Sequence, residues 1–481
     1  MTQATRVSRS WWLKLGVIAL VVIVLGGGTI LFLGWSADRR WQAYSAKLRA
    51  EGEPLTFVEI DALRTTVPND KNGARVVEAL LDELEAIRSA DTPKAVFFLA
   101  RSSSASRPDF FDGIPGASIQ PSREFLEQHR SARDELTRLG DYPDGRFDLT
   151  YQPISITMRF PHLAPLRAAA KLLALDAALA LIDGEFSRAA EDVQIQLRLA
   201  ALLNEEPDLI TRLVQIAIDA LAIKTLENTL RVGELPESIL ASLGTEFSSH
   251  LSSATLRWAL WAERANFAET CDQLALGKMS PTGLYPSSDV PTNFGWIPTV
   301  LFRRSQLRGT QMLSDLIAAR DDPNSMTEAA RKLTAETANL SMALYPLVHI
   351  LLPGLEGAVT HHLRSTAHID CARAAVAAER FRLNTDRLPS SPDELVPDYL
   401  DEWPTDPFDG QPMRLMVTDD GIVIYSVDDD AIDDGGSVAP VEGEKRARDV
   451  GFRLFKLDRR GLLIIDETSP AEAGSMERSE E

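Results

Sequence analysis

The sequence is poor in the residues from which compact reactive sites are built. Its 481 residues include two cysteines, Cys271 and Cys371, and seven histidines. Two cysteines 100 residues apart provide neither a disulfide framework nor a CxxC motif for a metal or a redox pair. We expect two separate thiols, and a single disulfide between them is left open.

The familiar catalytic signatures are also missing. The sequence contains no GxSxG motif, no GxxxxGK[ST] or GxGxxG phosphate loop and no HExxH zinc motif. Three serines at 102–104 lie in an expected loop with no base placed beside them. Acidic residues outnumber basic ones by 70 to 50, for a net charge of −20. This balance argues against nucleic acid, and against docking on anionic lipid, because both partners need a basic face.

Charge is absent from one stretch altogether. Between Lys14 and Asp38, the 23 residues 15–37 carry no charged side chain. A helix of that length reaches about 34 Å, enough for a hydrocarbon core of about 30 Å. We therefore expect a tail over 1–14 and a transmembrane helix over 15–37 that anchors the chain in the lipid bilayer. A cleaved signal peptide is the alternative, but Trp35 stands where its cleavage site needs a small residue.

Basic residues favour one orientation of this anchor. The N-terminal tail contains basic residues and no acidic ones: Arg6, Arg9 and Lys14. Further basic residues follow the stretch at 39–49, so the count alone does not decide the topology. We expect a single-pass protein of a bacterial cell membrane, with its N-terminus inside and its C-terminal domain outside the cytoplasm.

Most of the remaining chain is predicted to be helical. Residues 38–90 are expected to form juxtamembrane helices, with Thr56 and Glu59 at the spacing of a capping box. Residues 91–159 are expected to be an irregular linker region, because serine, proline and glycine gather there. A helical-hairpin domain is predicted over 160–385, since apolar residues recur at helical spacing and short turns join antiparallel neighbours.

One hairpin of this domain, at 178–189, is similar to a tetratricopeptide-type (TPR-like) unit, with small residues where two helices pack and a glycine at the turn. Residues 276–308 are expected to be irregular. Residues 340–359 are apolar enough to suggest a second membrane span. Prolines, a histidine and a glutamate interrupt the second segment, so we expect buried helices there rather than a second span.

The pattern changes after Pro389. Residues 388–412 contain six prolines, and the apolar period then shifts towards two. Strands are predicted at 413–417, 421–427, 451–457 and 461–465. We expect a small antiparallel β domain over 386–466 and a disordered tail over 467–481. The predicted fold class is mainly α, with a transmembrane helix, a TPR-like body and this C-terminal sheet.

Residues 369–451 resemble the C-terminal domain of the major pseudopilins of type II secretion systems. The strongest piece is 404–410, Pro-Thr-Asp-Pro-Phe-Asp-Gly, which is similar to the P-x-D-P-W-G-x-P-Y turn of that family. Residues 424–430 look like its Y-S-x-G-x-D-G strand and loop, and 449–451 like its D-D-I-G closing element. The whole layout also looks like uncharacterised single-pass bacterial membrane proteins. The glutamate of the family's cleavage signature is missing, so assembly into a pseudopilus is not implied.

The resemblance implies a calcium ion in the last loop. Asp430 and Asp449 match the family's ligands by position, with Asp433 or Asp434 as a third. Calcium takes six to eight oxygen ligands and suits carboxylates on a flexible loop. Residues 398–434 contain 12 acidic residues and one basic residue, Arg414. A solvated acidic loop without a metal is the alternative.

Two other polar groups are candidate sites. The histidine cluster shows no zinc-ligand spacing and predicts a polar helix face; it consists of His361, His362, His368 and Asp370. The pair Glu263 and Arg264 predicts an ordinary surface ion pair, with a buried pair or a recognition point as alternatives.

These observations favour a non-enzymatic interaction or scaffold protein, anchored in a membrane, with a protein or peptide partner on its helical surface. Calcium is the one cofactor suggested. Two alternatives belong to other classes. One is a membrane-anchored hydrolase with its site between the helical body and the sheet, and the other is a secretion- or pilus-associated subunit.

Overall fold

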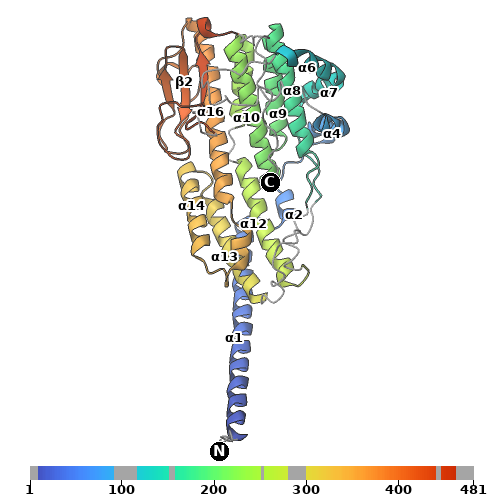
Figure 1. The fold of residues 1–481 in the computed structure, drawn as a ribbon, viewed down its shortest axis with the longest axis vertical. Helices are drawn as coiled ribbons and strands as arrows, with labels where there is room; N and C mark the ends of the chain where they lie inside the picture. Colours follow the sequence, from blue (N-terminus) through green and yellow to red (C-terminus); the bar gives the residue numbers. More distant parts are fainter. Residues whose placement is uncertain are drawn as a thin grey trace, which may run out of the picture.

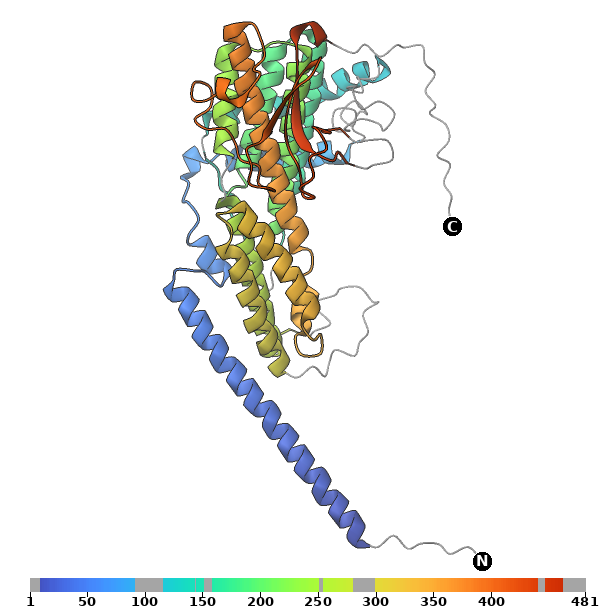
Figure 2. The same cartoon turned by 90° about the vertical axis from the view of Figure 1, so that its left-hand side faces the viewer.

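The structure, a computed structural model, describes residues 9–90, 116–142, 144–150, 158–250, 254–279, 299–439 and 446–461, with side chains before residue 32 described only in part. The molecule is a long bundle of helices with a small sheet on one side (Figure 1). One helix, α1 (Arg9–Ala50), extends away from one end of the bundle (Figures 1 and 2).

The structure corrects the prediction of a transmembrane helix. In the part of the chain that it describes, no helix is both long enough and apolar enough to cross a bilayer. The fully described portion of α1, residues 32–50, carries charges from Asp38 onward and does not meet both requirements. Most side chains of 15–31 lie outside the described residues. The expected single-pass localisation in a cell membrane is corrected with the span.

The first helices after α1 follow their sequence signals. Thr56 begins α2 (Phe57–Asp61), and the predicted capping box is confirmed, since Thr56 accepts from the Glu59 amide and Glu59 accepts from the Thr56 amide. Later in the region 38–90, where juxtamembrane helices are expected, the chain forms α3 (Ala74–Ala79) and α4 (Leu81–Ser89), with a break at Leu80.

The hairpin body contains the three long helices predicted for it. They are α8 (Leu163–Asp183), α9 (Phe186–Ala201) and α10 (Leu209–Val232). Gly184, with a φ of 76°, lets the chain turn back after α8, as the TPR-like pattern predicted. The next pair is α11 (Glu237–Ser249) and α12 (Ala254–Ala275).

Two stretches expected to be irregular are in part helical. Within 91–159 lie α6 (Gly116–Gln128) and α7 (Arg130–Thr137), and within 276–308 begins α13 (Thr299–Ala318). Phe125 and Leu136 show the reason, because they are buried against α8 in one core. The gain from this burial outweighs the helix-breaking signals, including Pro121 inside α6.

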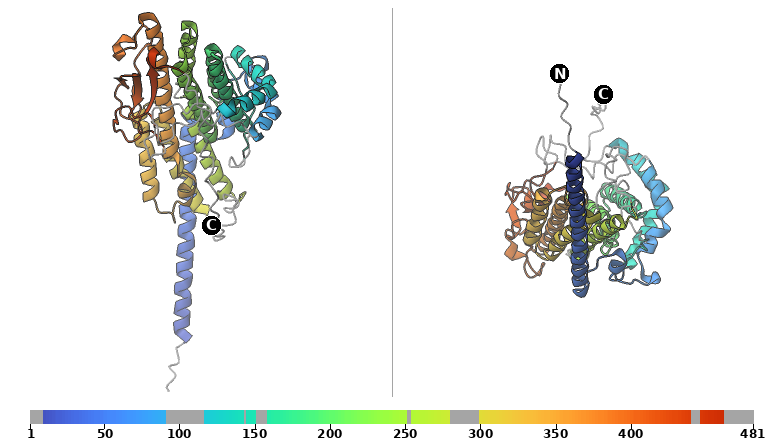
Figure 3. Two further views of the ribbon diagram at one scale, coloured as in Figure 1. Left: turned by 45° about the horizontal axis from the view of Figure 1, so that its top comes forward. Right: turned by 90° about the horizontal axis from the view of Figure 1, so that it is seen from below.

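The far half of the bundle has a core of its own. This core lies in the half of the bundle away from the sheet. It is formed by α2, α12, α13, α14 (Pro323–Asn339) and α15 (Pro346–Leu351). The long helix α16 (Leu355–Thr385) contributes its first turns to this core and its later turns to the core under the sheet. α16 therefore joins the two halves, as Figure 3 shows from other sides. The buried helices predicted for 340–359 are confirmed in part: α15 and the start of α16 form them, with a break at Pro353 and Gly354, whereas 340–345 are not helical and expose Met342 and Leu344.

The sheet has three antiparallel strands in the order β1 (Arg414–Val417), β2 (Gly421–Ser426) and β3 (Val450–Phe455). Ile424 of β2 pairs with Leu415 and with Phe452 on either side. The small antiparallel sheet predicted for this region is confirmed. The fourth strand is not seen at Gly461, and 462–465 lie outside the described residues.

The sheet packs directly on the helical body. Ile422, Ile424 and Phe452 share one core with Ala372 and Ala375 of α16. Alanines on this helix face let the sheet approach closely, which places the sheet and the body in one folding unit.

Candidate functional site

The four carboxylates predicted to bind calcium lie between β2 and the start of β3. Asp430 is exposed, and its Oδ1 accepts a hydrogen bond from the Ile432 amide in its own turn at 3.0 Å. Asp433 Oδ1 accepts from the Tyr425 hydroxyl at 3.0 Å and from the Gly435 amide at 2.9 Å. Asp434 lies 3.4 Å from the guanidinium of Arg448.

Asp449 is the buried member of this set. Its residue is 1% exposed, and its Oδ2 accepts from the Ser437 amide at 2.8 Å. Its Oδ1 is buried and has no hydrogen-bond partner in the described part of the chain. Burial raises the pKa of Asp449; the Ser437 and Asp434 amides oppose this shift, and repulsion from Asp434 and Asp433 adds to it. This carboxylate is therefore short of positive charge or of donors.

The residues present fit a calcium ion in part. Within the ranges that the structure describes, no group of three or more histidine, cysteine, aspartate or glutamate side chains is arranged to hold a metal. Asp433, Asp434 and Asp449 lie close enough to affect one another, whereas Asp430 bonds within its own turn. Calcium needs six to eight oxygens, so backbone carbonyls and water would have to supply most of them.

Asp428 occupies the position at which the pseudopilin pattern has glycine. Its φ is 61°, the left-handed conformation that glycine and short polar residues tolerate best. Its carboxylate is 2% exposed and lies 2.5 Å from Arg364 of α16. The loop is thus tied to the helix beneath it by a buried ion pair.

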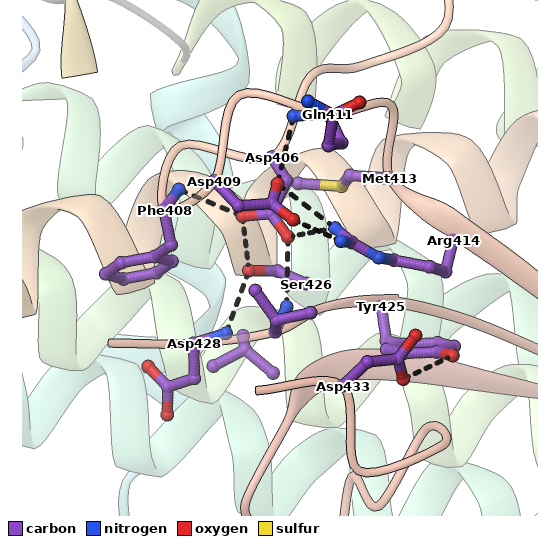
Figure 4. A network of polar contacts seen from close by, with 12 residues as sticks. Asp406, Phe408, Asp409, Gln411, Met413, Arg414, Tyr425, Ser426, Asp428 and Asp433 are labelled. Atoms are coloured by element: carbon purple, nitrogen blue, oxygen red, sulfur yellow. Dashed lines mark hydrogen bonds and ion pairs between the residues drawn. The ribbon is translucent and has the colours of Figure 1, made fainter. Parts of the chain in front are cut away.

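Asp406, in the segment 404–410, is the centre of a polar network (Figure 4). The residue is fully buried, and its Oδ1 accepts from the Ser426 hydroxyl at 2.8 Å and from the Phe408 amide at 3.0 Å. Its Oδ2 accepts from Arg414 at 2.7 Å and from the Val427 amide at 2.9 Å. Four donors satisfy the carboxylate, so its role is to hold this turn against β1 and the end of β2.

A second buried polar group follows one face of α10, where side chains three and four residues apart are neighbours. Arg212 donates to Gln215 Oε1 at 2.7 Å and contacts His362 Nδ1 of α16 at 3.0 Å. Farther along, Asp219 Oδ1 lies 3.1 Å from Nδ1 of His250, each side chain 1% exposed. Neither of these two side chains has an aligned hydrogen-bond partner in the described chain.

His162 and Glu206 form a third buried pair near the start of α10. Their closest nitrogen and oxygen lie 2.9 Å apart, and the imidazole stacks on Phe147 with ring centroids 4.1 Å apart. Glu206 also accepts from the Thr211 hydroxyl at 3.2 Å. Of the pair, His162 lines a pocket of about 370 Å³ that also includes Arg159.

The predicted histidine cluster is not a solvated helix face. Of its members, His361 is exposed, but His362 and Asp370 are buried. Burial, with repulsion from Arg212, lowers the pKa of His362, and burial lowers that of His368 to about 4. Burial raises the pKa of Asp370 to about 6, although Arg373 lies 2.9 Å away.

The predicted surface pair of Glu263 and Arg264 is also wrong. Arg264 is 1% exposed and pairs with Glu53 at 2.6 Å instead, while donating to the Pro54 carbonyl at 2.8 Å. This contact joins α12 to the segment after α1. Burial, with a contribution from Asp208, raises the pKa of Glu263 to about 7. Cys271 and Cys371 are both buried and unpaired, as expected.

A pocket of about 650 Å³ lies where α6, α7, α8 and α9 meet. Its floor is an ion-pair network centred on Asp176, which is 1% exposed and accepts from Arg133 at 2.6 Å and from Arg188. Arg123 closes one side through a two-pronged contact with Asp183, one bond of which measures 2.8 Å. The pocket is lined mainly by charged side chains.

Three other pockets lie nearby in the helical body. They have volumes of about 570, 320 and 370 Å³ and are lined by residues between 64 and 249. None of these four pockets is lined by a residue of the sheet. The three serines at 102–104 lie outside the described residues.

The sequence contains a signal for the polar group on α10. Arg212, Gln215 and Asp219 recur at helical spacing inside a largely apolar segment, which is unusual for a buried helix face. Their partners come from 250 and 362 and could not be found without the fold. In comparisons with known proteins, the chain matches no family model, no curated protein and no solved structure.

Proposed function

We propose that this chain is a non-enzymatic interaction protein whose helical body binds a protein or peptide partner. One observation supports it most. Asp406, which accepts four hydrogen bonds, is engaged within the fold, whereas the pocket between α6 and α9 presents charged side chains to solvent. Groups held by four donors are poorly placed for chemistry, and open charged pockets suit association.

The alternative of a hydrolase receives less support. Such an enzyme needs a nucleophile or an activated water beside a base, in a pocket between the body and the sheet. The four pockets above lie away from the sheet, and both cysteines are buried. Of the groups above, the His162–Glu206 pair comes nearest to a catalytic dyad, because His162 lines a pocket, but the Thr211 hydroxyl beside the pair is buried and donates to Glu206.

The proposal is tested by chemical crosslinking of the full chain in an extract of its source cells, followed by mass spectrometry. A partner crosslinked to α6–α9 supports it. In parallel, the purified chain is assayed with p-nitrophenyl esters and phosphates. Turnover by the wild type that disappears in His162→Ala and Glu206→Gln would replace the proposal with the hydrolase.

Calcium binding by the C-terminal loop is a second candidate property, and it is favoured by Asp449. A buried carboxylate oxygen without a donor, next to two other acids, is stabilised by a cation that relieves their repulsion. Asp433 and Asp434 are the neighbours that would share the ion.

A further inference from the structure

The charged side chains of the pocket between α6 and α9 fall into two sets. One set is engaged in ion pairs within the fold, and the other is exposed to solvent. Arg133 is 14% exposed at its side chain and contacts Asp176 at 2.6 Å, so this pair is buried and fixed. Arg188 also pairs with Asp176, and Glu191 and Asp192 also pair with Arg133, so both groups belong to one network. Arg123 and Arg188 have side chains that are 40% and 39% exposed, and they pair with Asp183 and Asp176. These three guanidiniums therefore shape the pocket floor and are occupied.

Three acidic side chains on the rim of the pocket are exposed and only weakly paired. Glu127 is 73% exposed and lies 3.4 Å from Arg130, which is itself 68% exposed. Asp134 is 62% exposed and lies 3.8 Å from Arg133. Glu124 is exposed and accepts one hydrogen bond from Gln120 at 2.9 Å. Exposed pairs of this kind contribute little and exchange easily for another cation.

The charges around the pocket do not balance. Five carboxylates and four guanidiniums line it. Three further acids, Glu185, Glu191 and Asp192, do not line the pocket but pair with its arginines. Burial raises the pKa of Asp192 well above its usual value and so disfavours its charge, and the count therefore leaves this group out. Seven carboxylates still surround four guanidiniums. The whole chain adds to this field with a net charge of −20.

We propose that this pocket binds a lysine- or arginine-rich segment of a partner protein. The proposal rests on the proposed function and adds the chemistry of the partner. The cationic side chains of the segment pair with Glu124, Glu127 and Asp134 along α6 and α7. The volume of about 650 Å³ is within the range in which proteins enclose ligands. The negative field of the chain attracts the segment over longer distances and accelerates its association.

The test measures fluorescence anisotropy of two labelled 12-residue peptides, one alternating lysine with alanine and one alternating glutamate with alanine, against the full chain. We expect the lysine peptide to bind, the glutamate peptide not to bind, and binding to weaken as salt rises. Glu124→Lys/Glu127→Lys should weaken binding about tenfold, since two favourable exposed pairs become repulsive.

A matched variant carries the same charge change elsewhere. Asp321 and Glu328 are exposed acids in and just before α14, in the other half of the bundle, and Asp321 also has a loose arginine partner. Asp321→Lys/Glu328→Lys should weaken binding less than twofold. If the first double variant fails to fold by circular dichroism, Glu124→Gln/Glu127→Gln replaces it and should weaken binding about threefold, since two exposed pairs are lost without repulsion.

Equal binding to the wild type and to the Glu124/Glu127 variants would overturn the inference, as would equal weakening by the α14 variant. Preference for the glutamate peptide, or binding of neither peptide, would also overturn it. If a native partner is still crosslinked to Glu124→Lys/Glu127→Lys, the interaction function stands and this inference fails. If no partner is found and ester turnover appears, the proposed function itself has failed.

Discussion

Glu379 of α16 provides a direct test of how the C-terminal segment is held on the body. Its side chain is fully buried and accepts four hydrogen bonds, two from Arg382 at 2.9 and 3.0 Å and two from Arg460 at 2.7 Å each. Arg460 follows β3 and also donates to the Gly233 carbonyl at 3.2 Å. The end of the described chain is thus attached to α16 and to the end of α10.

We expect Glu379→Gln to destabilise this attachment strongly. The side chain of Arg460 is 3% exposed and would keep its charge without a carboxylate beside it. Breaking a buried ion pair by removing one partner costs about 3–5 kcal/mol. Glu237→Gln is the matched control, because it breaks an exposed pair with Arg380 of the same helix, and such pairs contribute about 0–1 kcal/mol.

The measurement combines urea unfolding with hydrogen exchange of the peptide covering 446–461. Glu379→Gln should lower the free energy of unfolding and shorten the protection of that peptide, while Glu237→Gln should change neither measurably. Burial opposes ionisation of Glu379, but the two arginines outweigh it and lower the pKa below 4.5. The stabilisation is therefore complete above pH 4.5 and is lost as the pH falls through the lowered pKa of the folded state. Equal effects of the two substitutions would refute the reasoning.

Four further predictions follow from the same structure. Asp406→Asn should destabilise the protein by about 3 kcal/mol, because a buried charge partner of Arg414 is lost, whereas the exposed Asp401→Asn should have no measurable effect in urea unfolding. Calcium should raise the melting temperature of the wild type relative to chelator but not that of Asp449→Asn, with Asp401→Asn behaving as wild type; an unchanged wild type would end the calcium proposal. Glu263→Gln should stabilise the fold at pH 8 and not at pH 4, because the raised pKa of about 7 makes the charged carboxylate unfavourable in the folded state as the pH rises from 4.5 through 7. Cys271 and Cys371 should react with a thiol reagent in denaturant only, because both are buried and burial raises the pKa of each thiol, and rapid reaction of the native protein would contradict their placement.

Local signals in the sequence accounted for much of the helical body. The three long helices of the hairpin domain, the turn at Gly184 and the cap at Thr56 follow from apolar spacing and from residue types that act within a few positions. The three described strands likewise follow from local runs rich in Val, Ile, Leu, Phe and Tyr, although β2 is buried along its whole length and shows no alternation. Such features need no information from distant residues.

The polar sites could not be predicted in the same way. Arg264 was expected at the surface because its neighbour is Glu263, but the fold brings Glu53 to it from 211 positions away. His362 was grouped with His361 and His368, but its contact is Arg212, which is 150 positions away. Sequence spacing lists candidate partners along one helix, whereas burial selects partners from other helices.

The sequence by itself determined the mainly helical character of this protein, its acidic charge and the small antiparallel sheet near its end. The tertiary structure alone decided that α6 and α7 belong to the core and that the sheet shares a core with α16. It also decided which charges are buried and paired, and which stay exposed around a pocket. The reason is physical: helix and strand preferences act between near neighbours, but desolvation of a charged group depends on every element packed around it.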